Sequence, residues 1–172
     1  FAPPPAQAAT LLSQGRPVVA SSAEGPFAAV NAVDGNAGTR WGSAFTNNEW
    51  IYVDLGSTAT ISRVALNWEA AYGSGYQIQV SNNATTWTTI FTTTTGNGGA
   101  DDLTVLGSGR YVRMLGTARA TQWGYSLFEF QVFGTVGGGG ACATLPDAPT
   151  GLSAAGLSSA SVTISWTAPN PG

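Results

Sequence analysis

The run Trp50-Ile51-Tyr52-Val53-Asp54-Leu55 places an aliphatic residue at every second position of this 172-residue chain. Ile51, Val53 and Leu55 alternate with Tyr52 and Asp54, which is the period expected of a β-strand with one buried face. The same period recurs in the groups Val64, Leu66 and Trp68; Tyr76, Ile78 and Val80; Val112 and Met114; and Phe128, Phe130 and Val132. Each group therefore predicts a half-buried strand.

Turn signals separate these strands. Asp34-Gly35, Asn82-Asn83 and Gly96-Asn97-Gly98-Gly99 are typical turn sequences. No pattern with a period of 3.6 residues lasts long enough to predict a substantial helix. We therefore expect an all-β chain, folded over residues 10–134 as an antiparallel β-sandwich or jelly roll.

The composition excludes several function classes. Hydrophobic residues make up 43% of the chain and charged residues only 9%, with no His and a net charge of −3. The basic residues are all Arg, so a surface that tracks phosphates is not expected, and neither is a nucleic-acid partner. No apolar run approaches the roughly 20 residues that span a bilayer, so we expect no membrane association.

The two ends of the chain differ in character from residues 10–134. Residues 1–9 are rich in Ala and Pro, and Ala6-Gln7-Ala8 has the small-x-small form of a signal cleavage site, although a linker explains it equally well. Residues 135–145 form a Gly-rich linker that contains Cys142, the single cysteine, which cannot form an internal disulfide. These features favour secretion.

Residues 146–172 predict the beginning of a second module. Pro146-Asp147-Ala148-Pro149 precedes a stretch in which Val162, Ile164 and Trp166 alternate with polar residues. This stretch resembles the first two strands of a fibronectin type III module. Such a sandwich needs about 100 residues, so we interpret 146–172 as a truncated start.

The loop Asn31–Trp41 combines oxygen-bearing side chains with glycines, which favours a tight turn whose oxygens can face a hard cation. Trp41, Phe45 and Trp50 follow it. Oxygen ligands beside aromatic rings favour a site that binds a polyol over one that carries out chemistry. The alternative is a simple Asx turn, with Glu129 paired to an arginine.

These motifs together resemble the discoidin, or factor V/VIII C-type, domain and within it the family 32 carbohydrate-binding modules. The matching stretches are Ala32–Asn36 with Thr39–Trp41, Trp50–Gly56, Val64–Glu69, Tyr76–Ser81 with Trp87, Arg110–Arg113, and Gly124–Gly134. The resemblance implies a secreted, bacterial, monomeric and non-catalytic module, which holds a covalently linked glycan-degrading catalytic domain on a polysaccharide.

The resemblance also implies a structural calcium ion. Its ligands would be the side chains of Asp34, Asn36, Thr39 and Glu129, completed by carbonyl oxygens such as those of Ala32 and Phe128. Calcium accepts such mixed sets of oxygen ligands.

The resemblance places the sugar on loops at one end of the sandwich, at Glu24, Arg40, Phe45, Glu69, Trp123 and Tyr125. Carboxylates and a guanidinium suit hydroxyl or amine groups, and an indole covers the apolar face of a pyranose. Phe45 departs from the family pattern because it has no hydroxyl. Trp123 is the best candidate for an exposed ring, whereas Trp50, Trp68 and Trp87 favour core positions.

Two other functions compete with polysaccharide binding. Glu24 and Glu69 resemble the acid pair of a small glycosidase, but no His or Lys is available for other acid–base roles. An adhesion-type discoidin domain would carry basic or apolar rim loops, and this rim is acidic, aromatic and Asn-rich. The ligand that we expect is chitosan or an α- or β-glucan, with a slight preference for chitosan.

Overall fold

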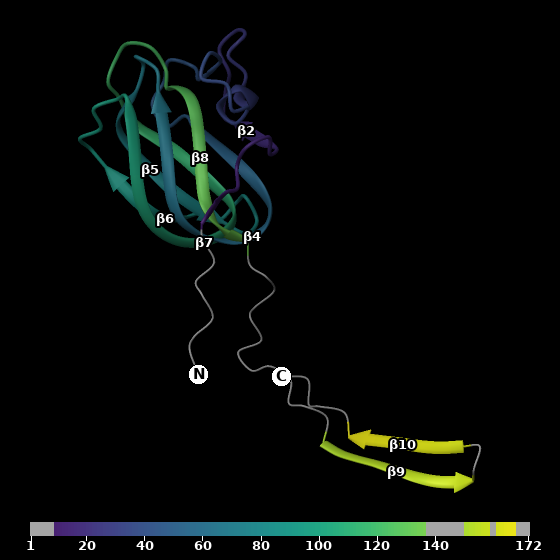
Figure 1. Cartoon of the computed structure of the whole chain (residues 1–172). Helices are drawn as coiled ribbons and strands as arrows, with labels where there is room; N and C mark the ends of the chain where they lie inside the picture. The colour runs from purple at the N-terminus through teal and green to yellow at the C-terminus, as the bar shows by residue number, and fades with distance from the viewer. Residues whose placement is uncertain (1–8, 137–149, 159–160, 168–172) are drawn as a thin grey trace. The chain divides into compact units, whose positions relative to one another are not determined.

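The computed structural model describes residues 9–136, 150–158 and 161–167, and the chain divides into two units (Figure 1). The first unit contains β1 (Thr10–Leu11), β2 (Val18–Ala20), a single 3-10 turn η1 (Ala29–Ala32), β3 (Trp41–Gly42), β4 (Trp50–Trp68), β5 (Gly73–Ser81), β6 (Thr88–Thr93), β7 (Ala100–Arg119) and β8 (Ser126–Val136). The second unit contains β9 (Thr150–Ser158) and β10 (Ser161–Thr167), which pair antiparallel.

Two long strands, β4 and β7, build the sandwich of the first unit. Before its bend, β4 pairs with β2 and with the second half of β7; after the bend it pairs with β8 and with the first half of β7. The pairing of β4 with β7 is interrupted between Asp54 and Ala59, where Gly56 has a φ of 86°. Strands β5 and β6 extend one layer, and β1 and β3 pair with β8 in the other. All pairs are antiparallel, so the predicted fold class is confirmed.

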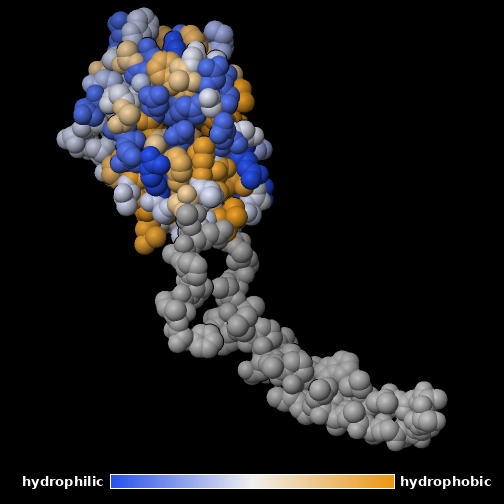
Figure 2. All heavy atoms as spheres, in the orientation of Figure 1, coloured by the Kyte–Doolittle hydropathy of each residue, from blue (hydrophilic) through white to orange (hydrophobic). Residues whose placement is uncertain are grey.

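The core lies between these two layers. Its largest fully buried side chains include Trp41, Tyr76, Tyr125 and Phe130. The residues at the predicted inward positions of β4, β5 and β7 are buried, Trp68 among them, and so are Phe130 and Val132 of β8. On the face shown in Figure 2, hydrophilic and hydrophobic residues are interspersed.

Phe128 and two tryptophans depart from the predicted pattern. Phe128 is only partly buried and Leu127 is buried instead, because the pairing of β4 with β8 shifts register between Asn67 and Trp68. Trp50 and Trp87 are half-buried on the outer face of the sheet, where both rings pack against Tyr52. The expectation that these two tryptophans lie in the core was wrong.

Some expectations fall partly or wholly outside the described residues. These concern the signal-like segment within 1–9, the glycine linker with Cys142, and residues 146–149. In the second unit the structure describes the antiparallel β9–β10 pair. The resemblance of this segment to a fibronectin type III module stays a prediction. Among the residues described, no helix is long and apolar enough to cross a membrane.

Candidate functional site

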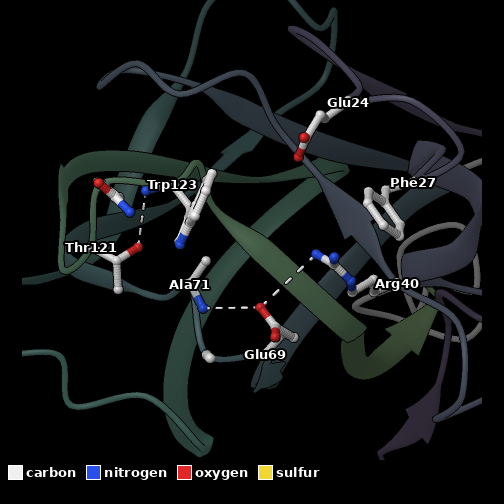
Figure 3. A pocket seen from close by; sticks show the side chains of 9 residues that line it. Glu24, Phe27, Arg40, Glu69, Ala71, Thr121 and Trp123 are labelled. Atoms are coloured by element: carbon white, nitrogen blue, oxygen red, sulfur yellow. Dashed lines mark hydrogen bonds and ion pairs between the residues drawn. The ribbon is translucent and has the colours of Figure 1, made fainter.

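Loops from four parts of the first unit meet in a pocket of about 530 Å³ (Figure 3). The segment between β2 and η1 contributes Glu24 and Phe27, and Arg40 lies directly before β3. The other lining residues come from the β4–β5 loop, with Glu69, Ala70 and Ala71, and from the β7–β8 loop, with Thr121, Gln122 and Trp123. In Figure 3, Trp123 stands across the pocket from Phe27 and Arg40, with Glu24 and Glu69 at its other sides.

Arg40 is held firmly within this pocket. Its guanidinium lies over the ring of Phe27, with Cζ 3.6 Å from the ring centroid, and its Nη1 donates a 2.7 Å hydrogen bond to the hydroxyl of Ser126. Nη1 also lies 3.9 Å from the Glu69 carboxylate. Because Trp41 is buried in the core, the chain presents the neighbouring Arg40 side chain outward, toward the rim. A guanidinium fixed in this way keeps other N–H donors for a ligand.

The two acids of the pocket differ in their surroundings. Glu69 accepts a 3.1 Å hydrogen bond from the Ala71 N–H in addition to its ion pair with Arg40. Glu24 is exposed, and no described residue forms a hydrogen bond or ion pair with its carboxylate. Its backbone is fixed, since the Glu24 N–H donates to the Gly42 carbonyl at 2.8 Å. The pocket therefore holds one carboxylate in an ion pair and one that has no ion pair or hydrogen bond with the described residues.

The aromatic wall of the pocket is Trp123, whose side chain is 52% exposed. Phe45 lies outside the set of lining residues, but its ring meets Trp123 edge-on with centroids 5.3 Å apart. An exposed indole of this kind provides a flat apolar surface beside two carboxylates.

The structure thus brings four of the six predicted sugar-site residues together: Glu24, Arg40, Glu69 and Trp123. It corrects the expectation for Tyr125, which is fully buried and offers no ring face to a ligand. Burial raises the pKa of the Tyr125 phenol to about 12. Phe27 was missed because it is separated from Arg40 by many residues, and the sequence contains no local signal for their stacking.

Comparison with known proteins identifies the family of the first unit. Residues 31–114 match the F5/8 type C family model described as a NedA-like, galactose-binding domain. A selenomethionine-labelled variant of chitosan-binding module 1 from a chitosanase/glucanase of Paenibacillus sp. IK-5 is 54% identical, with a TM-score of 0.70; the match covers 72% of this chain and 98% of that one. The chain belongs to the F5/8 type C family.

Two further proteins are similar to this F5/8 type C chain. Chitosan-binding module 2 of the same Paenibacillus enzyme, solved with chitotriose, is 49% identical with a TM-score of 0.69, covering 70% of this chain and 98% of that one. A polysaccharide lyase 8 family protein, HylA of Enterococcus faecalis, is 34% identical over 73 residues, or 42% of this chain. The chain spans about 5% of that protein's length. The two Paenibacillus relatives are binding modules, which confirms the prediction of a non-catalytic domain.

The Asn31–Trp41 loop of this F5/8 type C module forms a compact turn, in which side-chain oxygen atoms accept hydrogen bonds from other groups of the loop. Asp34 accepts hydrogen bonds from the Asn36 N–H at 2.8 Å and from the Thr39 hydroxyl at 2.7 Å. The Asn36 side chain accepts from the Gly38 N–H at 2.9 Å. The Asx-turn alternative therefore describes much of the loop correctly. The described residues include no cluster of three or more His, Cys, Asp and Glu side chains, so a cation here would also need amide, hydroxyl and carbonyl oxygens.

Glu129 is the feature of this region that the Asx turn leaves unexplained. Its Oε1 is buried without a hydrogen-bond partner among the described residues, and none of them forms a salt bridge with it. Burial and the nearby charge of Asp34 raise the pKa of Glu129, while the N–H groups of Gly35 and Asn36 act in the opposite direction. Two carboxylates that converge in this way, one with an orphaned oxygen, fit the chemistry of a calcium site. The 3-10 turn η1, with Ala32, packs against β8, which carries Phe128.

Proposed function

We propose that this module binds chitosan, a polymer of glucosamine, in the pocket formed by Glu24, Arg40, Glu69 and Trp123. The observation that carries the proposal is the uncompensated Glu24 carboxylate across the pocket from the Arg40–Glu69 pair. A protonated amine gains a charge-assisted hydrogen bond from a free carboxylate, whereas a neutral hydroxyl gains less. The identity of 54% and 49% to two chitosan-binding modules supports the same ligand.

Each side chain has a distinct part in this binding. Glu24 accepts hydrogen bonds from a sugar ammonium group, because none of the described residues occupies its carboxylate. Arg40, already fixed by Phe27 and Ser126, donates to ring hydroxyls without having to be ordered first. Trp123 covers the C–H face of one pyranose ring.

Calorimetric titration tests this proposal. Wild-type protein and Glu24→Gln are titrated with glucosamine oligosaccharides, with their N-acetylated counterparts and with cello-oligosaccharides of equal length. We expect wild-type protein to prefer the glucosamine oligomer and Glu24→Gln to lose that preference while keeping its fold. Binding of the neutral oligomers alone would contradict the proposal.

The wider role that we propose is to hold a covalently linked catalytic domain on the polysaccharide outside a bacterial cell. The origin of the Paenibacillus modules in a chitosanase/glucanase supports this role. Incubation with polysaccharides, followed by pull-down and an assay for new reducing ends, checks it for this module. Retention on the polysaccharide without new reducing ends is the expected result. New reducing ends, absent with a Glu24→Gln and Glu69→Gln double variant, would instead indicate a glycosidase.

We also propose that a calcium ion stabilises the module at Asp34, Asn36, Thr39 and Glu129, with carbonyl oxygens such as those of Ala32 and Phe128. The buried, unpartnered oxygen of Glu129 beside the charge of Asp34 supports this site. The ion would supply positive charge to two converging carboxylates. A ligand that binds only the folded state stabilises it by about 2.7 kcal/mol at a hundredfold excess over its Kd.

Chelation tests the calcium proposal. We expect a chelator to lower the Tm by several degrees, added calcium to restore it, and Glu129→Ala to abolish the response. The matched control is Asp102→Asn, which removes an exposed carboxylate paired with Arg63 and should leave the response intact. A wild-type Tm that is unchanged after prolonged dialysis against chelator would contradict the site.

A further inference from the structure

Arg119, the last residue of β7, connects two loops of the first unit. Its Nη1 donates hydrogen bonds to the carbonyl oxygens of Gln122 at 2.8 Å and of Trp123 at 3.1 Å. Its Nε donates to the side-chain oxygen of Asn47 at 3.2 Å. Asn47 belongs to the β3–β4 loop, which also carries Phe45. One guanidinium therefore joins the Trp123 loop to the Phe45 loop.

The Trp123 loop is anchored at both ends but has few hydrogen bonds between them. The Ala120 N–H donates to the Tyr72 carbonyl at 3.0 Å, and the Tyr125 N–H donates to the Ser43 hydroxyl at 2.8 Å. Between these anchors, the hydrogen bonds of the described residues are those from Arg119 and one from the Trp123 N–H to the Thr121 hydroxyl at 3.2 Å.

The indole of Trp123 itself has little to hold it. It is 52% exposed, and its aromatic neighbour Phe45, which meets it edge-on, is 41% exposed. Edge-to-face packing of two exposed rings restricts an indole only if the two loops keep their separation. The two loops are already joined where Ser43 meets Tyr125, and the Arg119 backbone N–H donates to the Asn47 side-chain oxygen at 3.3 Å. The guanidinium of Arg119 adds the link that reaches the carbonyl oxygens of Gln122 and Trp123 themselves.

We propose that Arg119 is a positioning residue that holds Trp123 in its binding orientation before the ligand arrives. This inference rests on the proposed function of Trp123 as the sugar platform. A side chain that must be ordered on binding loses affinity, by about 2- to 12-fold for one side chain, so orienting it in advance preserves that factor. Arginine suits the role because its planar fork reaches the Trp123 loop and Asn47 together, which a single ammonium group cannot reproduce.

The test uses ¹⁵N-tryptophan-labelled full chain, with the Trp123 indole resonance identified by Trp123→Phe. Relaxation of the Trp123 indole N–H on the picosecond-to-nanosecond timescale is measured without ligand, and the Kd for glucosamine oligosaccharides is measured separately. The variants are Arg119→Ala, Arg119→Lys and Asn47→Ala, which removes only the link to the Phe45 loop. The matched control is Arg63→Gln, since Arg63 is an exposed arginine paired with Asp102.

We expect the order parameter of the Trp123 indole to fall in Arg119→Ala while that of Trp50 stays constant, and the Kd to rise about 3- to 10-fold. Arg119→Lys and Asn47→Ala should give intermediate values of both quantities. Arg63→Gln should change neither the order parameter nor the Kd. An unchanged order parameter with a weakened Kd would overturn the proposal, because Arg119 would then contact the ligand directly. An unchanged order parameter and Kd would overturn it as well.

The relaxation measurement separates this inference from the proposed function. If wild-type protein binds no glucosamine oligomer, the proposed function is wrong, yet the free-protein order parameters still show whether Arg119 orients Trp123. If Arg119→Ala does not fold, Arg119→Lys and Asn47→Ala carry the same comparison.

Discussion

Trp123 and Trp68 carry the same indole in opposite surroundings, so their removal should have opposite effects. Trp68 is 4% exposed and its Nε1 donates a 2.9 Å hydrogen bond to Asp101. We expect Trp68→Ala to destabilise the module by about 3–5 kcal/mol, as truncation of a buried aromatic side chain does. Trp123→Ala should instead cost more than about 1 kcal/mol of binding free energy and leave the Tm nearly unchanged.

Thermal denaturation and calorimetric titration of both variants distinguish these effects. The reversed pattern, with Trp123→Ala unfolding the module and Trp68→Ala abolishing binding in a folded protein, would show that core and platform have been exchanged.

Tyr125 gives a second prediction at the scale of one residue. Its hydroxyl is buried without a hydrogen-bond partner among the described residues. An unpaired buried polar group costs about 1–3 kcal/mol, so Tyr125→Phe should raise the Tm and leave the Kd for glucosamine oligomers unchanged. A lower Tm would show that the hydroxyl has a partner, and a weaker Kd would restore Tyr125 to the sugar site.

At the scale of the elements, one ion pair fastens β4 to β7 just before the bend. Arg110 donates two hydrogen bonds to Asp54, each 2.7 Å long. The Arg110 guanidinium lowers the pKa of Asp54 below its ordinary value of 3.8. A lowered pKa in the folded state means that the pair stabilises the fold above that ordinary value, and that this stability is lost as the pH falls through the lowered pKa.

The difference in Tm between wild type and Asp54→Asn isolates this pair. We expect wild type to be the more stable protein at neutral pH, and the difference to shrink below about pH 4. Glu129, whose pKa is raised, affects both proteins alike and cancels from the difference. Asp102→Asn should show a smaller difference at neutral pH, because the Asp102 side chain is 65% exposed against 20% for Asp54. A difference that is independent of pH would contradict this assignment.

The strands were predictable from the sequence because burial on one face imposes a period of two, as in Ile51, Val53 and Leu55. The register of β8 could not be predicted in this way. A register shift opposite Trp68 turns Leu127 toward the core and Phe128 away from it, and this shift depends on the pairing of β8 with β4. The burial of Tyr125 could not be predicted for a related reason. Its ring lies over Gly116, where an added Cβ would be 2.2 Å from the ring. No residue near Tyr125 in the sequence indicates this contact.

The candidate site was predictable only in part. A family pattern locates Glu24, Arg40, Glu69 and Trp123, which the structure brings together. Such a pattern did not indicate Phe27 under Arg40, or Arg119 behind Trp123, because these contacts depend on how separate loops meet. Residues that support others through tertiary contacts leave no periodic signal in a sequence.

At the scale of the whole first unit, the pocket lies near one end of β8. The first and last described residues of this unit lie near the other end. Thr10 pairs with Gly134, near the end of β8, whereas Ser126, at its beginning, bonds to Arg40 in the pocket. Ser126 and Gly134 are eight residues apart along β8, which corresponds to about 26 Å at a rise of about 3.3 Å per residue. This polarity suits the proposed role, in which the module is linked to a catalytic domain at one end and binds polymer at the other.

The overall charge of the chain bears on which polymer is bound. A net charge of −3 without Lys attracts a cationic chain over longer distances than any single contact, but only within a screening length of about 8 Å at physiological ionic strength. Glucosamine oligomers should therefore bind more weakly as salt rises, by up to about fivefold if one exposed ion pair is screened. Cello-oligosaccharides carry no charge and should show no salt dependence.

Titrations in low and high salt, with wild type, Glu24→Gln and Glu69→Gln, distinguish the local from the global contribution. Glu24→Gln should flatten the salt dependence most, because no described residue pairs with the Glu24 carboxylate, whereas Glu69 already forms an ion pair with Arg40. An equal flattening in both variants would assign the effect to net charge alone. A salt-independent Kd for the glucosamine oligomer would remove the amine from the recognition and leave only hydroxyl binding by Arg40 and stacking on Trp123.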